Sequence, residues 1–364
     1  MTDTANNSVS TPADEKALAV ADLRVEFDAH GGIVQAVRGV SFDVAKGETL
    51  GIVGESGCGK SVTMMSVMGL IPMPPGRIVS GSAKLNGREL LGLSTAELNR
   101  IRGADIGMIF QDPMSALNPT MRVGEQIAET LMVHRGMSHG DALKKAVQLL
   151  DRTKVPEAAK RARQYPFEFS GGMLQRAVIA MSLVCNPSVL IADEPTTALD
   201  VTIQNQVLEL MREIQKEEGM AIVLITHDLG VVARMADKVA VMYAGQVVER
   251  GSVDDIFYRS AHPYTLGLRD AMPAPDMHVD QKLLAIPGSP PDLFAPPPGC
   301  GYCSRCPYAL SVCAERDSGL IEVGASHDSR CWLQYPGAPA PAAAQPTNAT
   351  AAQLYLRAQQ EESV

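Results

Sequence analysis

The segment GESGCGKS, residues 54–61, constrains the fold of this chain more than any other feature. It matches the pattern G-x-x-x-x-G-K-[ST], in which a glycine-rich loop joins a buried strand to a helix. The apolar run LGIV precedes it, and the helix-like segment SVTMMSVMGLI follows from its last residue. Glycines allow the backbone N–H groups to face phosphate oxygens, and a helix N-terminus adds partial positive charge. The segment therefore predicts a phosphate-binding loop in an α/β fold.

Each position of this loop has an expected role in nucleotide binding. Lys60 is expected to reach the β- and γ-phosphates, and the Ser61 hydroxyl is expected to bind Mg²⁺. Cys58 is interpreted as a small loop residue rather than a nucleophile. The alternative is a glycine-rich turn without a ligand, which the flanking strand and helix disfavour. The predicted nucleotide contacts in the loop are Gly54, Glu55, Ser56, Gly57, Cys58, Gly59, Lys60 and Ser61.

Strand-like and helix-like segments alternate along much of the chain. LRVEF and VSFDV alternate like antiparallel strands, and residues 92–182 look mostly helical. VLIAD, AIVLITH and KVAVMYAG are short apolar runs separated by helical segments such as VTIQNQVLELMREIQKEEG. Such alternation indicates a parallel α/β sheet.

Two of the apolar strands end in polar residues that suit phosphate chemistry. Asp193 and Glu194 follow VLIA, and His227 ends AIVLITH. Asp193 is expected to act as an outer-sphere magnesium ligand, and Glu194 to polarise an attacking water. Ligands of such sheets bind at the carboxyl ends of the strands, so His227 is interpreted as a sensor of the γ-phosphate. The alternative is that these strands simply end in polar residues.

Charge and patterning limit the possible partners and location. The 364 residues carry a net charge of −9, so bulk electrostatics predict no nucleic-acid partner. The first twenty residues lack the basic start and apolar core of a signal peptide. No apolar run approaches the roughly 18 residues of a membrane span. We therefore expect a protein of the cytoplasm, or one peripheral to a membrane through partners, with reduced thiols.

Five of the seven cysteines gather near the end of the chain, four of them within PPPGCGYCSRCPYALSVC. Thiolates suit zinc or an iron–sulfur cluster, since soft ligands select those centres. A zinc ribbon has two separated C-x-x-C pairs, and the second is missing here, whereas iron–sulfur clusters accept irregular spacing. Free thiols without a metal are the third alternative. The predicted ligands are Cys300, Cys306, Cys313 and Cys331, with Cys303 as an extra thiol and His327 as an unfavoured substitute.

The order of motifs resembles the nucleotide-binding subunits of ABC transporters. GESGCGKS is followed by FQDP, FSGGM at 169–173, LIADEP and TALD at 197–200. The resemblance implies that Phe27 stacks on adenine and that Gln111 contacts magnesium and the attacking water. It also implies that a signature segment caps the γ-phosphate across a dimer interface, and that Asp200 links the two sites. The signature residues are Ser170, Gly171 and Gly172.

The resemblance also implies an architecture. The expected fold is α/β: a P-loop NTPase ABC nucleotide-binding domain with an antiparallel β subdomain, a helical subdomain and a Cys-rich C-terminal extension. The expected parts are a disordered tail at 1–17, the ATPase domain at 18–267, the extension at 268–335 and an Ala/Pro-rich tail at 336–364. The helical subdomain spans about residues 92–182 and is expected to contact membrane partners.

The resemblance can be narrowed to the ATP-binding subunits of oligopeptide and dipeptide permeases, and most to the oligopeptide D-type subunits. It rests on MIFQDPMSALNP, MRVGEQI, LIADEPTTALDVTIQ and HPYTLGL. Such systems imply a second ATPase as heterodimer partner, two transmembrane permease subunits and a periplasmic or extracellular peptide-binding protein. Two departures are Cys58, where serine is commoner, and Leu174, where a basic residue is usual.

The resemblance bears on the cysteines and on the function. Related subunits carry a similar cysteine extension, for which a [4Fe-4S] cluster is implied, with zinc as the weaker alternative. Because this extension lies outside every ATP motif, losing its cysteines is expected to weaken folding more than ATP contact. The expected activity is hydrolysis of ATP coupled to peptide import. The alternatives are a soluble ABC ATPase acting on the ribosome or nucleic acid, an importer subunit for nickel or glutathione, and half of an exporter.

Overall fold

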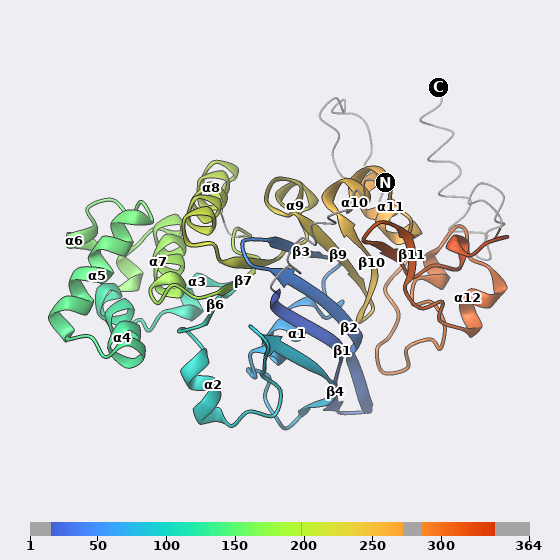
Figure 1. The fold of residues 1–364 in the computed structure, drawn as a ribbon, viewed down its shortest axis with the longest axis horizontal. Helices are drawn as coiled ribbons and strands as arrows, with labels where there is room; N and C mark the ends of the chain where they lie inside the picture. Colours follow the sequence, from blue (N-terminus) through green and yellow to red (C-terminus); the bar gives the residue numbers. More distant parts are fainter. Residues whose placement is uncertain (1–15, 198, 272–285, 339–364) are drawn as a thin grey trace, which may run out of the picture.

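The computed structural model describes residues 16–197, 199–271 and 286–338 (Figure 1). Most of the two tails predicted at 1–17 and 336–364 lies outside these residues. Figure 1 shows three regions along the long axis of the molecule, with helices at one end, two sheets in the centre and the C-terminal extension at the other end. The fold predicted for the ATPase, with its antiparallel and helical parts, is confirmed.

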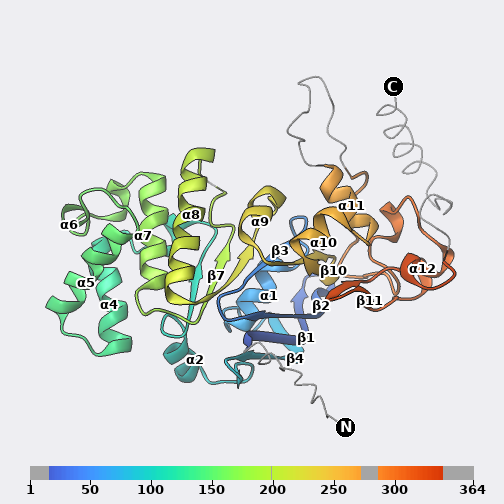
Figure 2. The same cartoon turned by 45° about the horizontal axis from the view of Figure 1, so that its top comes forward.

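The first sheet has four antiparallel strands in the order β2-β1-β4-β5. Their bounds are β1 Lys16–Ala29, β2 Gly32–Ala45, β4 Gly76–Leu85 and β5 Arg88–Glu89. The alternating pattern of LRVEF and VSFDV is explained by this pairing, in which Leu23 of the first segment lies opposite Val40 of the second. The apolar residues of β1 and β2 face a core shared with α1 (Lys60–Val67), so α1 lies between the two sheets (Figure 2).

The second sheet has eight strands in the order β11-β12-β10-β9-β3-β8-β7-β6. The parallel part contains β3 Thr49–Val53, β6 Ile106–Ile109, β7 Val189–Asp193, β8 Ala221–Ile225 and β9 Lys238–Tyr243. These strands are buried along nearly their whole length, as parallel strands covered on both faces are. Their carboxyl ends therefore meet at one edge of the sheet.

The parallel order predicted for these strands is confirmed, and it ends at β9. There β10 Gln246–Ser252 returns antiparallel to β9, and β12 His327–Ser329 and β11 Ile321–Gly324 continue the antiparallel order. The β9–β10 turn contains Ala244 and Gly245, both with positive φ, 48° and 77°. Such a two-residue turn favours a tight hairpin over a helical crossover.

Six helices, α2 to α7, follow one another in this part of the chain: α4 to α7 form the helical end of the molecule, whereas Ile101 of α2 packs in the core shared by the first sheet and α1 (Figure 1). Their bounds are α2 Thr95–Ile101, α3 Pro113–Ala116, α4 Val123–Arg135, α5 His139–Arg152, α6 Ala158–Arg161 and α7 Gly171–Leu183, with the short turn η1 Pro166–Glu168. Apolar residues of α4, α5 and α7, among them Ile127, Leu150 and Val178, form one core with α8. The mostly helical character expected of this stretch is interrupted by strand β6.

The remaining helices lie beside the main sheet and in the extension. They are α8 Val201–Glu218, α9 Leu229–Met235, α10 Val253–Tyr258, α11 Pro263–Asp270, η2 Cys303–Arg305, α12 Ser311–Glu315 and η3 Trp332–Gln334. A third core joins β9 to α11 and the extension through Tyr243, Tyr264 and Tyr302. Among the described residues, no helix has the length and apolar character needed to cross a membrane.

Candidate nucleotide-binding site

The phosphate loop lies between β3 and α1, at the carboxyl edge of the parallel strands. The φ values of Gly54, Gly57 and Gly59 are 152°, 80° and 98°, a range that residues with a side chain rarely adopt. A Cβ atom on Gly54 would lie 2.1 Å from the Met242 carbonyl oxygen, and one on Gly59 would lie 2.5 Å from that of Ala36. The glycines therefore let this loop pass close to its neighbours and curl its N–H groups inward.

Lys60 lies over the loop that precedes it. Its Nζ donates to the carbonyl oxygens of Gly54, at 2.7 Å, and Glu55, at 2.9 Å. The ammonium group is therefore held at the mouth of the loop. Cys58 is buried beside it, and burial raises the pKa of this thiol. A protonated thiol is a weak nucleophile, in agreement with the interpretation of Cys58 as a small loop residue.

Ser61 and Asp193 meet across the site. The Ser61 hydroxyl donates to Asp193 Oδ1 at 3.0 Å, so the start of α1 and the end of β7 are joined. Asp193 is buried, and this desolvation, followed by repulsion from Glu194, raises the pKa of its carboxyl. Hydroxyl and carboxylate oxygens are the donors that Mg²⁺ takes in proteins. The pair fits a magnesium ion in its chemistry.

The Glu194 carboxylate contacts both of the other residues predicted to take part in the chemistry, Gln111 and His227. Its Oε2 accepts from Gln111 Nε2 at 2.9 Å and from the Thr197 hydroxyl at 2.9 Å, and its Oε1 lies 3.2 Å from His227 Nδ1. Burial raises the pKa of Glu194, but hydrogen bonds from His227 and Thr197 outweigh it, so the pKa is lowered. Glu194 is thus ionised and able to accept a proton.

Thr197 is a partner that sequence reasoning missed. It lies in TALD, the segment from which only Asp200 was predicted as a functional residue. Its spacing of three residues from Glu194 is the one feature of the sequence that indicates a contact between them. Glu194 itself has φ of 48°, an unusual value for a side chain other than glycine or asparagine. This backbone turn lets Thr197 reach back to the Glu194 carboxylate.

The predicted signature residues lie apart from the phosphate loop in this chain. Ser170 caps α7, where its hydroxyl accepts from Met173 N–H at 3.4 Å, and Gly171 and Gly172 begin the helix. Figures 1 and 2 both place α7 in the helical end and α1 between the sheets. Leu174 is buried in the core of that end, so it packs rather than facing an anion.

Two further predicted contacts have local structural partners. Asp200 caps α8, and its Oδ1 accepts from Ile203 N–H at 3.0 Å. Phe27 is partly buried on β1 and packs against the core beneath the first sheet. It lies so close to Gly76 that a Cβ there would be 2.9 Å from Phe27 Cε1. The roles predicted for Asp200 and Phe27 toward a nucleotide remain predictions.

The five clustered thiols surround one small cavity in the extension. Cys306, Cys313 and Cys331 are buried, Cys300 and Cys303 are partly buried, and all five line the cavity. Burial raises the pKa of each thiol, to about 12 for Cys300 and Cys331. Within the described parts of the chain, no three Cys, His, Asp or Glu side chains form a ready metal-ligating group. The soft donors fit a cluster or zinc by chemistry, and a metal here remains a prediction.

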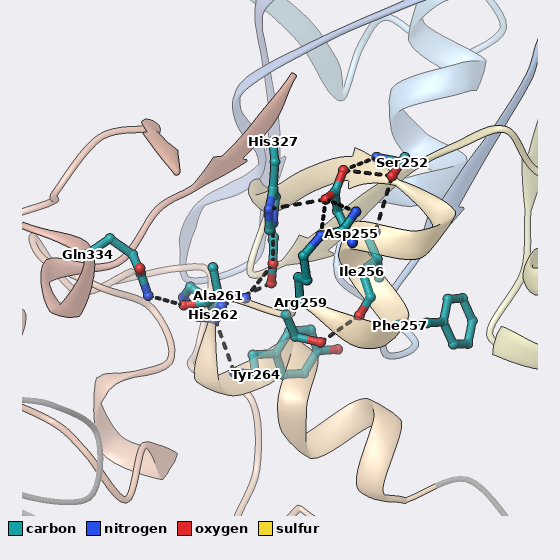
Figure 3. A network of polar contacts seen from close by, with 12 residues as sticks. Ser252, Asp255, Ile256, Phe257, Arg259, Ala261, His262, Tyr264, His327 and Gln334 are labelled. Carbon is teal, nitrogen blue, oxygen red and sulfur yellow. Dashed lines mark hydrogen bonds and ion pairs between the residues drawn. The ribbon is translucent and has the colours of Figure 1, made fainter. Parts of the chain in front are cut away.

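Figure 3 shows a polar network that attaches the extension to the main sheet. The labelled residues Ala261, His262 and His327 all contact Glu249 of β10, which is 0% exposed. Glu249 accepts from the N–H groups of Ala261, at 2.6 Å, and His262, at 3.0 Å, and its Oε1 lies 2.8 Å from His327 Nε2. The hydrogen bond to Glu249 raises the pKa of His327. His327 is therefore a buried structural anchor and not the surface histidine that the sequence favoured, and its use as a substitute metal ligand gains no support.

Comparison with known families agrees with the motifs. A family model described as "ABC transporter" matches residues 37–197. A second model, "Oligopeptide/dipeptide transporter, C-terminal region", matches residues 248–313, which include the first four clustered cysteines. The two models together span the phosphate loop, Gln111, Glu194 and part of the extension, and His227 lies between the two matched ranges.

Relatives match over most of the chain. The Bacillus subtilis "Oligopeptide transport ATP-binding protein OppD" is 54% identical over 88% of this chain and 90% of its own length. The dipeptide protein DppD of the same organism is 54% identical over 88% of this chain and 95% of its length. The Escherichia coli OppD protein is 54% identical over 82% of this chain and 87% of its own length.

Solved structures share the ATPase part of the fold. A dimer of the ATP-binding cassette MJ0796, described as a post-hydrolysis state with ADP and phosphate, has a TM-score of 0.59 and 27% identity. The match covers 65% of this chain and 98% of the MJ0796 chain. The cbiO1 protein of Clostridium perfringens has a TM-score of 0.56 with 27% identity, covering 67% and 91%.

Proposed function

The chain belongs to the family of ATP-binding subunits of oligopeptide and dipeptide ABC transporters, and on this premise we propose that it hydrolyses ATP to drive peptide import. The convergence of Gln111, Thr197 and His227 on the Glu194 carboxylate carries the proposal. This constellation lies at the strand edge that also presents Lys60. The relatives' names refer to peptides. No observation favours a soluble ATPase acting on the ribosome or nucleic acid, an importer subunit for nickel or glutathione, or half of an exporter.

The proposed chemistry assigns a task to each side of the site. The N–H groups of the loop and Lys60 bind the triphosphate, and Ser61, Gln111 and Asp193 hold Mg²⁺, which when bound offsets phosphate charge. Glu194 accepts a proton from the attacking water. His227 donates toward the γ-phosphate, because its ring already lies beside Glu194 and is mostly exposed.

A single chain supplies only half of the proposed site. The signature at Ser170–Gly172 and the Asp200 link lie in the helical end and at the start of α8, away from the loop of the same chain. We assign them to the phosphate loop of a second, similar ATPase in a head-to-tail heterodimer. The proposed complex also contains two transmembrane permease subunits and an external peptide-binding protein, and this chain is peripheral on the cytoplasmic face of the cell membrane.

The proposal divides the chain at the positions expected from the sequence. Residues 18–267 form the ATPase, with a helical subdomain at about 92–182, and residues 268–335 form the extension. Cys300, Cys306, Cys313 and Cys331 are assigned to a [4Fe-4S] cluster, with Cys303 spare and zinc as the alternative. Support comes from five thiols around one cavity. Anaerobic purification followed by iron, sulfide and zinc analysis tests this assignment, with Cys306→Ser as the variant that should lose the metal.

Reconstitution of the whole transporter tests the main proposal. The complex should hydrolyse ATP only with its partner ATPase present, and hydrolysis should rise with peptide-loaded binding protein. Lys60→Ala should abolish nucleotide binding by this subunit, because it removes the ammonium group that lies over the carbonyl oxygens of Gly54 and Glu55. Absence of peptide-stimulated hydrolysis by the complete complex would contradict the proposal, and co-purification with ribosomes or nucleic acid would favour the alternative.

A further inference from the structure

The extension reaches the phosphate loop through one buried arginine. Arg305 ends η2 and lies between the thiols of Cys303 and Cys306 in sequence. Its side chain is only 5% exposed, and its Nη1 donates to Glu55 Oε2 at 2.9 Å. Glu55 is the second residue of the loop, 250 positions earlier in the chain. The extension is therefore not separate from the nucleotide site, contrary to the expectation from the motif positions alone.

Arg305 is held in a fixed orientation by partners on several sides. Its Nη1 also donates to the Tyr243 hydroxyl at 3.1 Å, its Nε to the Pro287 carbonyl at 2.9 Å and its Nη2 to the Ile286 carbonyl at 3.2 Å. The guanidinium lies 5.7 Å from the centre of the Tyr243 ring. A planar group with several donors suits such a set of partners, and lysine would not match it.

Glu55 is fixed through its backbone as well as through its carboxylate. Its N–H donates to the Tyr264 hydroxyl at 2.9 Å, and its carbonyl accepts from Lys60 at 2.9 Å. The Tyr243 and Tyr264 rings pack behind the loop with centroids 4.5 Å apart, and Tyr302 of the extension packs against both. One residue of the loop thus joins Arg305 on one side to the phosphate-binding lysine on the other.

We infer that Arg305 is a positioning residue that neutralises Glu55 and holds the phosphate loop ready for ATP. This inference rests on the proposed binding of ATP at that loop. Among the ion pairs of the described residues, Arg305 is the cation that pairs with the Glu55 carboxylate, and Lys60 is already bonded to the Glu55 carbonyl. An uncompensated carboxylate beside the loop repels the triphosphate and competes with it for Lys60.

The test measures ATP affinity of the full-length chain, with melting temperature measured in parallel without nucleotide. Arg305→Met should weaken ATP binding by about tenfold or more, the equivalent of about 1.4 kcal/mol per tenfold. Arg305→Lys should recover part of this loss. Glu55→Gln combined with Arg305→Met should bind ATP within about threefold of Glu55→Gln alone, because no unpaired charge remains for the arginine to offset.

Arg330→Met is the matched control within the extension. Arg330 is also largely buried, and it bonds to the Val247 carbonyl and Asp317 rather than to the loop. It should lower the melting temperature while leaving ATP affinity unchanged. In the reconstituted complex, Arg305→Met should raise KM for ATP much more than it lowers kcat.

Three results would overturn the inference. They are unchanged ATP affinity in Arg305→Met, an equal loss when Arg305→Met is added to Glu55→Gln, and an equal loss in Arg330→Met. The last two would indicate a purely structural role. Failure of the wild-type chain itself to bind ATP would instead contradict the proposed function, so the two failures are distinguishable.

Discussion

The nucleotide site and the thiol-rich extension are held in place by different physical means. In the nucleotide site, parallel strands end at one edge, where Lys60 begins α1, Asp193 ends β7 and Glu194 follows it. The extension has little regular structure, and buried groups such as Glu249 and Arg305 join it to the rest. Regular strands fix position through many equivalent hydrogen bonds, whereas the extension depends on a few contacts that are costly to break.

The largest expected effect is in the nucleotide site. Glu194→Gln removes the group that accepts the proton but keeps its size, so ATP hydrolysis should fall by about a thousandfold, within the usual range for a general base. ATP binding should persist, and the ATP-bound heterodimer should accumulate. Phosphate release by the reconstituted complex measures the rate, and gel filtration with ATP measures the dimer.

Thr197→Val is the matched control for this prediction. It removes one of three hydrogen bonds to Glu194 and leaves the carboxylate in place. Hydrolysis should fall only severalfold. A Glu194→Gln complex that turned over like the wild type would refute the assigned role of Glu194.

The second effect concerns the stability of the extension. Cys306 is buried in the third core, whereas Cys303 is partly exposed at the same cavity. Cys306→Ala should cost about 1–3 kcal/mol of unfolding free energy, and Cys303→Ala about 0.5 kcal/mol. Denaturant unfolding measures both. If the purified protein holds iron, Cys306→Ala should lose it and Cys303→Ala should keep it, and equal behaviour of the two variants would contradict the ligand assignment.

The third effect depends on pH and should be confined to the extension. The Glu249 hydrogen bond raises the pKa of His327 above its ordinary 6.5; Asp255 acts in the same direction and Arg259 against it. Protonated His327 therefore stabilises the folded protein fully below pH 6.5, and this contribution is lost as pH rises through the raised pKa. The melting temperature should fall by about 2 °C across that interval.

His327→Gln should remove this slope, and His139→Gln is its control. His139 contacts Glu125 at 2.7 Å on the exposed surface of the helical end, where solvent screens the pair. The control should keep the wild-type pH dependence. A slope retained in His327→Gln would show that another group is responsible.

The smallest effect is expected at the one loop thiol. Cys58→Ser should change KM for ATP by less than about twofold, because serine is similar in size and its oxygen can accept from Lys60 Nζ, from which the Cys58 sulfur now accepts at 3.7 Å. Thiol-modifying reagents should react slowly with Cys58 in the wild type, since burial raises its pKa. Steady-state kinetics and mass spectrometry measure the two outcomes, and fast modification would contradict the buried placement.

Sequence reasoning recovered the nucleotide site better than the extension. The loop, Asp193, Glu194 and His227 are each tied to a local strand-loop pattern, so their neighbourhood follows from the order of strands. Gln111 came from the family resemblance. The bond between Arg305 and Glu55 joins segments 250 residues apart, and no periodicity or motif links them. The return of β10 and its pairing with β12 were missed because β10 lacks a distinctive alternating pattern and β12 has only three residues.

The pairing of β10 with β12 has a consequence for the order in which the protein is made. β12 bonds to the outer edge of β10, where Glu249 faces Ser329 and Arg250 pairs with Asp328. During synthesis from the N-terminus, the ATPase strands emerge first, with this edge bare and Glu249 lacking His327. Bare strand edges favour pairing with other chains. The nascent protein is therefore most prone to aggregation in the interval before residues 327–329 emerge and cover the sheet.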